Sequence, residues 1–266
     1  MLKDITLGQY YQTDSILHRS DPRVKLTGTL IYIVVLFVAQ NIWGYALAAV
    51  FLAVMIALSK VPVKFMLKGM RSIAFLITLT VVFNLFMTPG EVIWSFYKLK
   101  ITAEGLKMAA RMAIRLIFLI MGSNIMTLTT TPGELTDGLE SLLSPFKVFH
   151  APVHEIAMMM SIALRFIPIL MEETDKIMKA QMARGASFDE GNIIERAKSL
   201  VPLLVPLFVS AFRRASDLAL AMEARCYRGG DKRTRMKPLR YKVSDYVAYG
   251  VLIMLLAASI ALRICL

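Results

Sequence analysis

The chain of 266 residues is 57% hydrophobic and 19% charged, and its mean hydropathy is +0.60. Soluble domains contain about 45 to 50% apolar and about 25% charged residues, so this composition excludes an ordinary soluble globular protein. The 31 Lys and Arg outnumber the 19 Asp and Glu, giving a net charge of +12. Such a basic chain is either embedded in a membrane or bound to nucleic acid.

Uncharged stretches predict the membrane spans. The first, residues 26–59, would measure about 51 Å as one helix, well beyond a hydrocarbon core of about 30 Å, so we expect a hairpin of two spans. We assign its turn to Gln40, Asn41 and Gly44. Three further stretches are each close to the length that a spanning helix needs: residues 72–90, 116–133 and 246–262. The sequence therefore predicts an all-α, polytopic membrane protein with about five transmembrane helices.

The short loops indicate how these spans are oriented. Basic residues precede the first span and separate the second from the third, whereas the hairpin turn carries none. These residues are Lys3, Arg19, Arg23 and Lys25, then Lys60, Lys64, Lys68 and Arg71. Because cytoplasmic loops carry an excess of Lys and Arg, we expect the N-terminus inside and, after five spans, the C-terminus outside.

Residues 131–242 hold 17 Lys and Arg and 13 Asp and Glu, more than half of all the charges. We therefore predict an N-terminal membrane region with four spans (1–130), a large cytoplasmic helical region (131–242) and a C-terminal span (243–266). Thr131, Pro132 and Glu134 open the middle region with a capping-box pattern. The short helix that they start is expected to end at Ser144 and Pro145.

Two long helices follow, each with a proline-containing apolar first half and a polar second half. The first begins near Pro152 and stops at Ala183-Arg184-Gly185, and the second begins near Glu195 and stops at Ala224-Arg225-Cys226. Arg184 and Arg225 lie 41 positions apart. When the first helix is shifted by the same 41 positions onto the second, an acidic pair falls opposite a basic pair. These candidates for charge pairs between the helices are Glu172, Glu173, Arg213 and Arg214.

The apolar halves of these helices are alternative candidates for two further spans. Residues 199–212 would form a helix of about 21 Å, which is too short to cross the bilayer. This segment also contains Pro202 and Pro206. In the other helix Arg165 would lie deep in the bilayer, at a cost of about 2.5 to 3.5 kcal/mol. We favour cytoplasmic helices whose apolar faces contact the membrane surface or a partner, with a seven-span chain as the alternative.

The sequence carries no complete enzyme signature. It has no GxxxxGK[ST] loop to cradle ATP phosphates. His154 and Glu155 begin an HExxH-like string, but Met158 stands where the second His is needed, and Pro152 separates His150 from His154. We therefore expect no catalytic, cofactor-binding or metal-binding residues in this chain.

A basic run precedes the last predicted span: Arg228, Lys232, Arg233, Arg235, Lys237, Arg240 and Lys242. A cluster in this position is typical of contacts with anionic lipid head groups. Nucleic acid is the alternative, but neither an aromatic platform nor a groove-reading motif accompanies the run. We expect the lipid bilayer, and no nucleic acid, as the partner of these residues.

Four short motifs occur in order along nearly the whole chain. They are Asp21-Pro22-Arg23-Val24-Lys25-Leu26, Arg165-Phe166-Ile167-Pro168, Ala183-Arg184-Gly185 and Glu223-Ala224-Arg225-Cys226-Tyr227. This arrangement resembles the transmembrane T component of energy-coupling factor (ECF) transporters, the EcfT/CbiQ family.

The resemblance implies a non-catalytic scaffold in the cell membrane. In that family two coupling helices end in Arg-centred motifs, each docking on one of two cytoplasmic ATPases, which hydrolyse the ATP. A separate membrane S component captures a vitamin or a metal ion. The implied ATPase-docking residues are Ala183, Arg184, Gly185, Ala224, Arg225 and Cys226. The second motif departs from the family because it ends in Cys226, so Gly229 is the candidate for the left-handed cap of that helix.

Two other functions are weaker alternatives. A self-sufficient secondary transporter would be expected to show an internal repeat and broken helices at the bilayer midplane, and neither is evident. An intramembrane enzyme would need a catalytic constellation, for which Glu172 and Glu173 alone are thin support. The coupling subunit explains both the spans and the large charged insertion.

The orientation predicts which introduced cysteines an impermeant thiol reagent reaches in intact cells. Single cysteines near Lys64, Ser187 and Leu266 would lie in the second loop, the large insertion and the C-terminus. Because the charge asymmetry places only the last of these outside, we expect labelling at that site alone. Labelling of either of the other two sites in intact cells would contradict the orientation.

Overall fold

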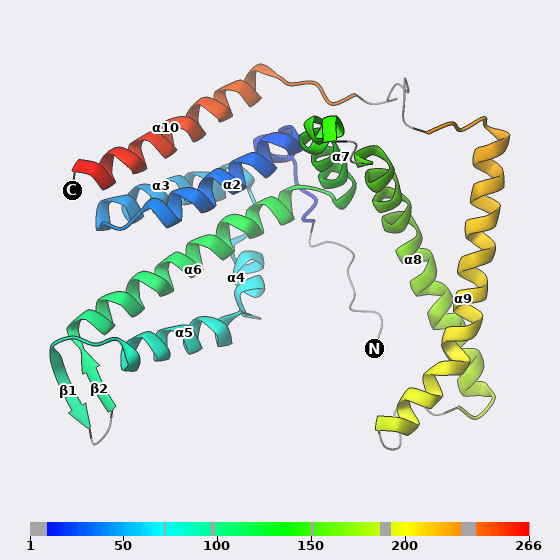
Figure 1. The fold of residues 1–266 in the computed structure, drawn as a ribbon, viewed down its shortest axis with the longest axis horizontal. Helices are drawn as coiled ribbons and strands as arrows, with labels where there is room; N and C mark the ends of the chain where they lie inside the picture. Colours follow the sequence, from blue (N-terminus) through cyan, green and yellow to red (C-terminus); the bar gives the residue numbers. More distant parts are fainter. Residues whose placement is uncertain are drawn as a thin grey trace. The chain divides into compact units, whose positions relative to one another are not determined.

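The computed structural model (Figure 1) describes residues 10–71, 73–96, 99–149, 152–186, 193–229 and 238–265. Several residues named above lie outside these ranges: Lys3, His150, Ser187, Lys232, Arg233, Arg235, Lys237 and Leu266. The chain divides into two compact units. We name Gly8–Ser141 with Leu239–Leu266 the membrane unit, and Leu142–Pro238 the helix-pair unit.

The helices of the membrane unit are α1 (Ile16–Arg19), α2 (Pro22–Val38), α3 (Ile42–Ser59), α4 (Val63–Arg71), α5 (Ala74–Met87), α6 (Ala103–Thr129), α7 (Pro132–Leu143) and α10 (Val243–Cys265). Helix α6 packs against α2, α3, α4 and α5, and α10 packs against α2 and α3. Val35, Leu36, Ala48 and Met66 are fully buried at the centre of this packing. The predicted helical class is confirmed by this arrangement.

Contacts at the helix ends fix the direction of each helix. Asp21 at the start of α2 meets Asp245 at the start of α10, and Asn41 after α2 donates to the Leu262 carbonyl near the end of α10, over 3.5 Å. Helices α2 and α10 therefore run parallel. Helix α6 runs the other way, because its last residue, Thr129, lies beside Lys25 of α2. Parallel α2 and α10 are compatible with an odd number of spans.

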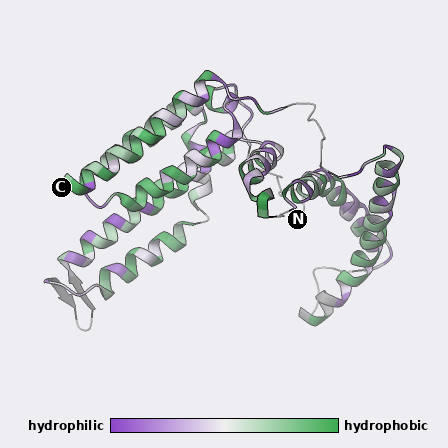
Figure 2. Ribbon diagram, turned by 45° about the horizontal axis from the view of Figure 1, so that its top comes forward, coloured by the Kyte–Doolittle hydropathy of each residue, from purple (hydrophilic) through white to green (hydrophobic). Residues whose placement is uncertain are grey.

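Among the described residues, four helices are long and apolar enough to cross a membrane: α3, α6, α8 (Val153–Ala183) and α10. Figure 2 shows that α10 is hydrophobic over most of its length. Helix α2 has 17 residues and the apolar α5 has 14, so both are shorter than an ideal span of about 20 residues. Because α8 also reaches spanning length, its apolar half remains the basis of the seven-span alternative.

The turn of the α2–α3 hairpin is formed by Ala39, Gln40 and Asn41. Gly44 lies inside α3, so its assignment to the turn was wrong. A Cβ at Gly44 would lie 3.0 Å from the Ala39 Cβ, and the glycine instead lets the first turn of α3 approach the end of α2. Arg115 of α6 donates to the Ala39 carbonyl over 3.4 Å, and this cation therefore stabilises the C-terminal end of α2.

A β-hairpin that the sequence did not predict connects α5 to α6. Strands β1 (Val92–Phe96) and β2 (Leu99–Thr102) pair antiparallel, with Phe96 opposite Leu99 and a bulge between Val92 and Trp94. The β-branched and aromatic residues of β1 have high strand propensity, which explains why this segment does not continue as helix.

The helix-pair unit contains α8, α9 (Ile193–Ala224) and the 3-10 helix η2 (Ser144–Phe149). The segment before it begins at the capping box: the Thr131 hydroxyl accepts from the Glu134 N–H at 3.3 Å, and the Glu134 carboxylate accepts from the Thr131 N–H at 3.1 Å. The start of α7 and its end before Ser144 are therefore as the sequence predicted.

The close packing of α6 on α2 gives a stability prediction. A Cβ at Gly122 would lie 2.6 Å from Cε1 of Tyr32, whose ring is buried, so Gly122→Ala should overpack this contact and cost about 1 to 3 kcal/mol. We expect a lower melting temperature in detergent.

Gly250→Ala is the matched control, because no atom lies within 4 Å of the position a Cβ would take there. Alanine also has the higher helix propensity, so this control should leave the melting temperature unchanged or raised. Equal melting temperatures for the two variants would show that Gly122 is not a close-approach position.

Candidate functional site

The end of α8 is closed by a Schellman motif, the helix end in which a left-handed residue turns the chain back. Gly185 has φ +90°, and its N–H donates to the Met182 carbonyl at 3.0 Å. The Ala186 N–H donates to the Gln181 carbonyl, also at 3.0 Å. These two bonds satisfy carbonyls that the last helical turn leaves without intrahelical donors. Arg184 is the cap residue at the centre of the motif.

The end of α9 repeats this geometry residue for residue. The Cys226 N–H donates to the Glu223 carbonyl at 2.8 Å, and the Tyr227 N–H donates to the Met222 carbonyl at 3.0 Å. Cys226 itself takes the left-handed position, with φ 55°. The assignment of the cap to Gly229 was therefore wrong: a cysteine carries the conformation, at a cost of about 1 kcal/mol relative to glycine.

Both central arginines present free cations. Arg184 and Arg225 are exposed, and neither guanidinium makes a hydrogen bond or ion pair within the part of the chain that the structure describes. A guanidinium offers five donors in a planar fork, and each one here stands at the negative end of a helix dipole. The two ends can thus each hold carboxylates or carbonyls of another molecule.

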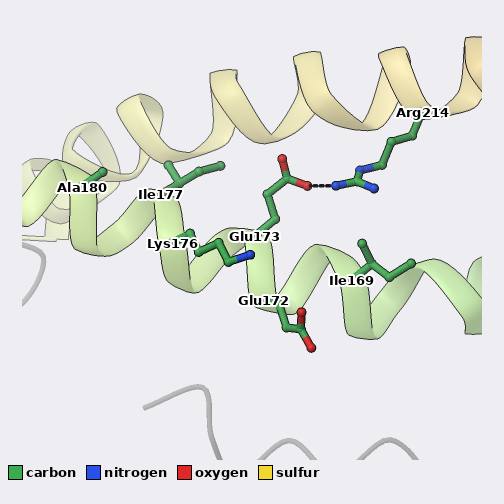
Figure 3. A pocket seen from close by; sticks show the side chains of 7 residues that line it. All are labelled: Ile169, Glu172, Glu173, Lys176, Ile177, Ala180 and Arg214. Carbon is green, nitrogen blue, oxygen red and sulfur yellow. Dashed lines mark hydrogen bonds and ion pairs between the residues drawn. The ribbon is translucent and has the colours of Figure 1, made fainter.

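Helices α8 and α9 are joined by an ion pair. Arg214 of α9 donates from Nη2 to Oε2 of Glu173 at 2.8 Å (Figure 3). The Ser210 hydroxyl donates to Oε1 of the same carboxylate at 2.5 Å. The Ser210 hydrogen bond, and then the Arg214 cation, lower the pKa of Glu173 below its ordinary value. Of the four residues considered for charge pairs, the structure brings together Glu173 and Arg214.

The other two candidates are not brought together. Glu172 points away from α9 in Figure 3, and Arg213 is exposed without an ion pair among the described residues. Ser210 was missed by the sequence analysis. It lies four residues before Arg214, on the same face of α9, and this spacing is the signal that identifies it as a second donor to Glu173.

A second contact between the helices supplies a donor to a backbone carbonyl that a proline leaves without its partner within the helix. Pro206 has no N–H to donate to the Pro202 carbonyl one turn earlier. The Gln181 side chain of α8 donates to this carbonyl instead, over 3.4 Å. Because Glu173 meets Ser210 while the later Gln181 meets the earlier Pro202, the two helices are antiparallel, as Figure 1 also shows.

The antiparallel pairing carries the two arginine-bearing ends to opposite ends of the pair. Arg184 follows Gln181 by one turn, whereas Arg225 lies 23 residues beyond Pro202, about 35 Å along α9. The matching ends therefore cannot contact one small surface together. The two ends therefore lie on separate parts of the helix-pair unit.

An apolar stripe runs along α9. Its members recur at three- and four-residue spacing and are between 42% and 71% exposed: Val201, Leu204, Val205, Phe208 and Phe212. Exposed apolar surface of this kind marks contact with a protein partner or a membrane. An apolar cavity of about 750 Å³ also lies in the membrane unit, among α2, α3, α6 and α10. Within the described residues, no group of three or more His, Cys, Asp or Glu could hold a metal ion.

Comparison with known proteins identifies the family. The family model for CbiQ, described as a cobalt transport protein, matches residues 13–236. The chain is 54% identical over 251 residues to the energy-coupling factor transporter transmembrane protein EcfT of Ruminiclostridium cellulolyticum, covering 94% of each chain. It is 55% identical over 262 residues to the EcfT protein of Thermosediminibacter oceani, covering 98% of this chain and 99% of the relative.

The EcfT protein of Bacillus subtilis is 46% identical over 264 residues, covering 99% of this chain and 100% of the relative. A membrane protein with these helices and these relatives is a transporter subunit. The chain belongs to the EcfT/CbiQ family of energy-coupling factor transporter transmembrane proteins.

The ion pair between α8 and α9 is open to a double-mutant cycle. Glu173→Gln and Arg214→Gln, alone and together, should reveal a coupling free energy of unfolding of about 0.2 to 1 kcal/mol, because the pair is partly exposed. Because the pKa of Glu173 is lowered in the folded protein, the ion pair contributes fully to stability above pH 4.5, the ordinary pKa of this carboxyl group. The contribution is lost as the pH falls below that value.

The same cycle on Glu172 and Arg213 provides the control, since these side chains face no partner among the described residues. Unfolding in detergent mixtures at neutral pH and at pH 3 measures both cycles. A coupling in the control that equals that of the Glu173 cycle would contradict the specific pairing.

Proposed function

We propose that this chain is the non-catalytic coupling subunit of an ECF-type importer. It transmits ATP hydrolysis by two cytoplasmic ATPases to a substrate-binding S component, for uptake of vitamins or other micronutrients. The observation that carries the proposal is the pair of matched helix ends with free arginines. The two docking sites are Ala183, Arg184 and Gly185 on α8, and Ala224, Arg225 and Cys226 on α9.

The chemistry of each helix end suits docking in a groove. The arginine supplies charge-assisted hydrogen bonds to carboxylates and carbonyls of the ATPase, each worth about 1.5 to 3 kcal/mol. The residue after each arginine is small, so the groove can close around the end of the helix. The chain turns back sharply at Gly185 and at Cys226, which both have positive φ angles. In this proposal the arginine before each turn is therefore the side chain at the tip of the helix that enters the groove.

Two ATPases, one for each end, are favoured over one. The ends share the same backbone hydrogen bonds and the same central residue type, so equivalent grooves can accept them. They lie at opposite ends of an antiparallel pair, about 35 Å apart along α9. A pair of equivalent ATPase subunits meets both conditions.

The apolar stripe of α9 supports a second contact, with the S component or the bilayer surface. Phe208 and Phe212 are 61% and 71% exposed, which is unfavourable in water and favourable against an apolar partner. In this proposal the helix-pair unit lies on the cytoplasmic side. The exposed Arg228, Arg240 and Lys242 precede α10, where they suit anionic lipid head groups.

Replacing both docking arginines tests this function. The Arg184→Ala, Arg225→Ala double variant should lose association with the ATPases and uptake, while expression and membrane insertion continue, because neither residue lies in a span. Lys at both positions should restore function only partly, since an ammonium group lacks the planar fork. Copurification of the ATPases and uptake by cells are the two measurements.

Arg213→Ala is the matched control, because it removes an exposed guanidinium from α9 away from either end. This control should assemble and transport as the unmodified chain does. A double variant that retained its ATPases and transported at the unmodified rate would refute the docking role of Arg184 and Arg225.

A further inference from the structure

The first turn of α2 contains a buried set of charges. Asp21 caps α2 by accepting from the Arg23 N–H at 2.9 Å, and its own N–H donates to Oδ1 of Asp245 at 3.2 Å. The second oxygen of Asp245 accepts from the Lys242 N–H at 2.8 Å and so caps α10. Asp21 and Asp245 are 7% and 1% exposed. The Asp245 carboxylate thus joins the beginnings of α2 and α10, through two residues that are 224 positions apart in the sequence.

Arg23 extends this contact to the segment that leads into α10. Its Nη2 donates to the Leu239 carbonyl at 3.0 Å, and its guanidinium lies over the Tyr241 ring, 4.6 Å from the centroid. A 3.5 Å ion pair with Asp21 holds the guanidinium in place. Leu239 is the first residue of the membrane unit after the chain leaves the helix-pair unit.

Lys25 extends it to the end of α6. Its buried ammonium group donates to the Thr129 carbonyl at 2.9 Å and to the His18 carbonyl at 3.3 Å. Thr129 is the last residue of α6, so the cation lies at the negative end of that helix. Two residues later the chain enters the capping box of α7.

Helix α7 is seated on the same turn. Gly138 lies so close to α2 that a Cβ there would be 3.1 Å from Cβ of Pro22 and 3.1 Å from Cδ1 of Leu26. The membrane unit ends at Ser141, three residues after Gly138. The segment that enters the helix-pair unit is therefore packed against α2 immediately before it leaves.

Within residues 10–265 the chain passes between the two units twice, at Ser141–Leu142 and at Pro238–Leu239. Both passages are held by residues 22–26, one through Gly138 and the other through Arg23. We propose that this turn is the anchor through which movement of the helix-pair unit reaches the membrane spans. Pro22, Arg23 and Lys25 are positioning residues for transport.

The inference rests on the proposed function, because it needs ATPases that move the helix-pair unit. Its physical basis is that hydrogen-bonded charges in a largely buried site and close-packed backbone do not deform gradually. A displacement at either passage is therefore passed to α2, and through Asp245 and Lys25 to the ends of α10 and α6. Helix α2 packs against both of these helices as well as against α3.

Gly138→Ala tests the anchor, because the added methyl group pushes α7 away from Pro22. Spin labels on genetically encoded ketone residues at Lys179 of α8 and Met254 of α10 would report the distance between the units, with Cys226 and Cys265 left intact. The complex with its ATPases and S component is measured in nanodiscs, without nucleotide and with ATP and vanadate. We expect a nucleotide-dependent distance change in the unmodified complex and less than half of it in Gly138→Ala, with ATP hydrolysis retained.

Gly133→Ala is the control on the same helix, since no atom lies within 4 Å of its added Cβ, and it should respond as the unmodified complex does. Arg23→Gln, which releases Leu239 without adding volume, decides the question if Gly138→Ala does not assemble. An unaltered response in the deciding variant, or none in the unmodified complex, overturns the anchor. Failure of the ATPases to copurify with the unmodified chain would instead refute the proposed function.

Discussion

The charges buried at the start of α2 are the constraint on which the membrane unit depends. Asp21, Arg23, Lys25 and Asp245 balance one another, and each also bonds to backbone, which is the condition under which buried charges are tolerated. Among lipid tails the hydrophobic effect does not drive helices together, so close packing and polar contacts determine how they are arranged. The polar contacts therefore fix which ends meet, and the apolar contacts of Val35, Leu36 and Ala48 then fill the space that these contacts define.

The helix-pair unit is held together in a different way. Its links are the partly exposed Glu173–Arg214 pair and the Gln181 bond to a carbonyl that Pro206 leaves free. Partly exposed ion pairs contribute little free energy, so this pair determines the register of the crossing more than its stability. In the function proposed above, a crossing with a set register keeps the two helices aligned while each end engages a different partner.

The features predicted correctly from the sequence depend on residues that are near one another in the chain. The features that the sequence did not predict depend mainly on contacts between residues that are far apart in it. The Thr131–Glu134 capping box, the ends of α8 and α9 and the family motifs all depend on residues within a few positions of one another. The link from Asp21 to Asp245 spans 224 residues and leaves no periodic signal. The 41-residue offset pointed to Glu173 and Arg214 as partners but did not indicate whether the two helices run parallel or antiparallel. A single contact between two helices is compatible with either direction. Strand β1 was not predicted, because a segment of only five residues gives little periodic pattern.

The two helix ends show which feature of the arginine-centred motif the fold preserves. At α8 the left-handed position is Gly185, where the conformation is free of strain, and at α9 it is Cys226, where it is not. Both ends nevertheless make the same pair of backbone bonds, and both project arginine from the cap position. The shared requirement is therefore the shape of the backbone with a small side chain after the arginine, and glycine is one way to meet it. A substitution that keeps this turn and this size preserves the direction of the guanidinium, whereas a bulky or β-branched residue at either position loses it.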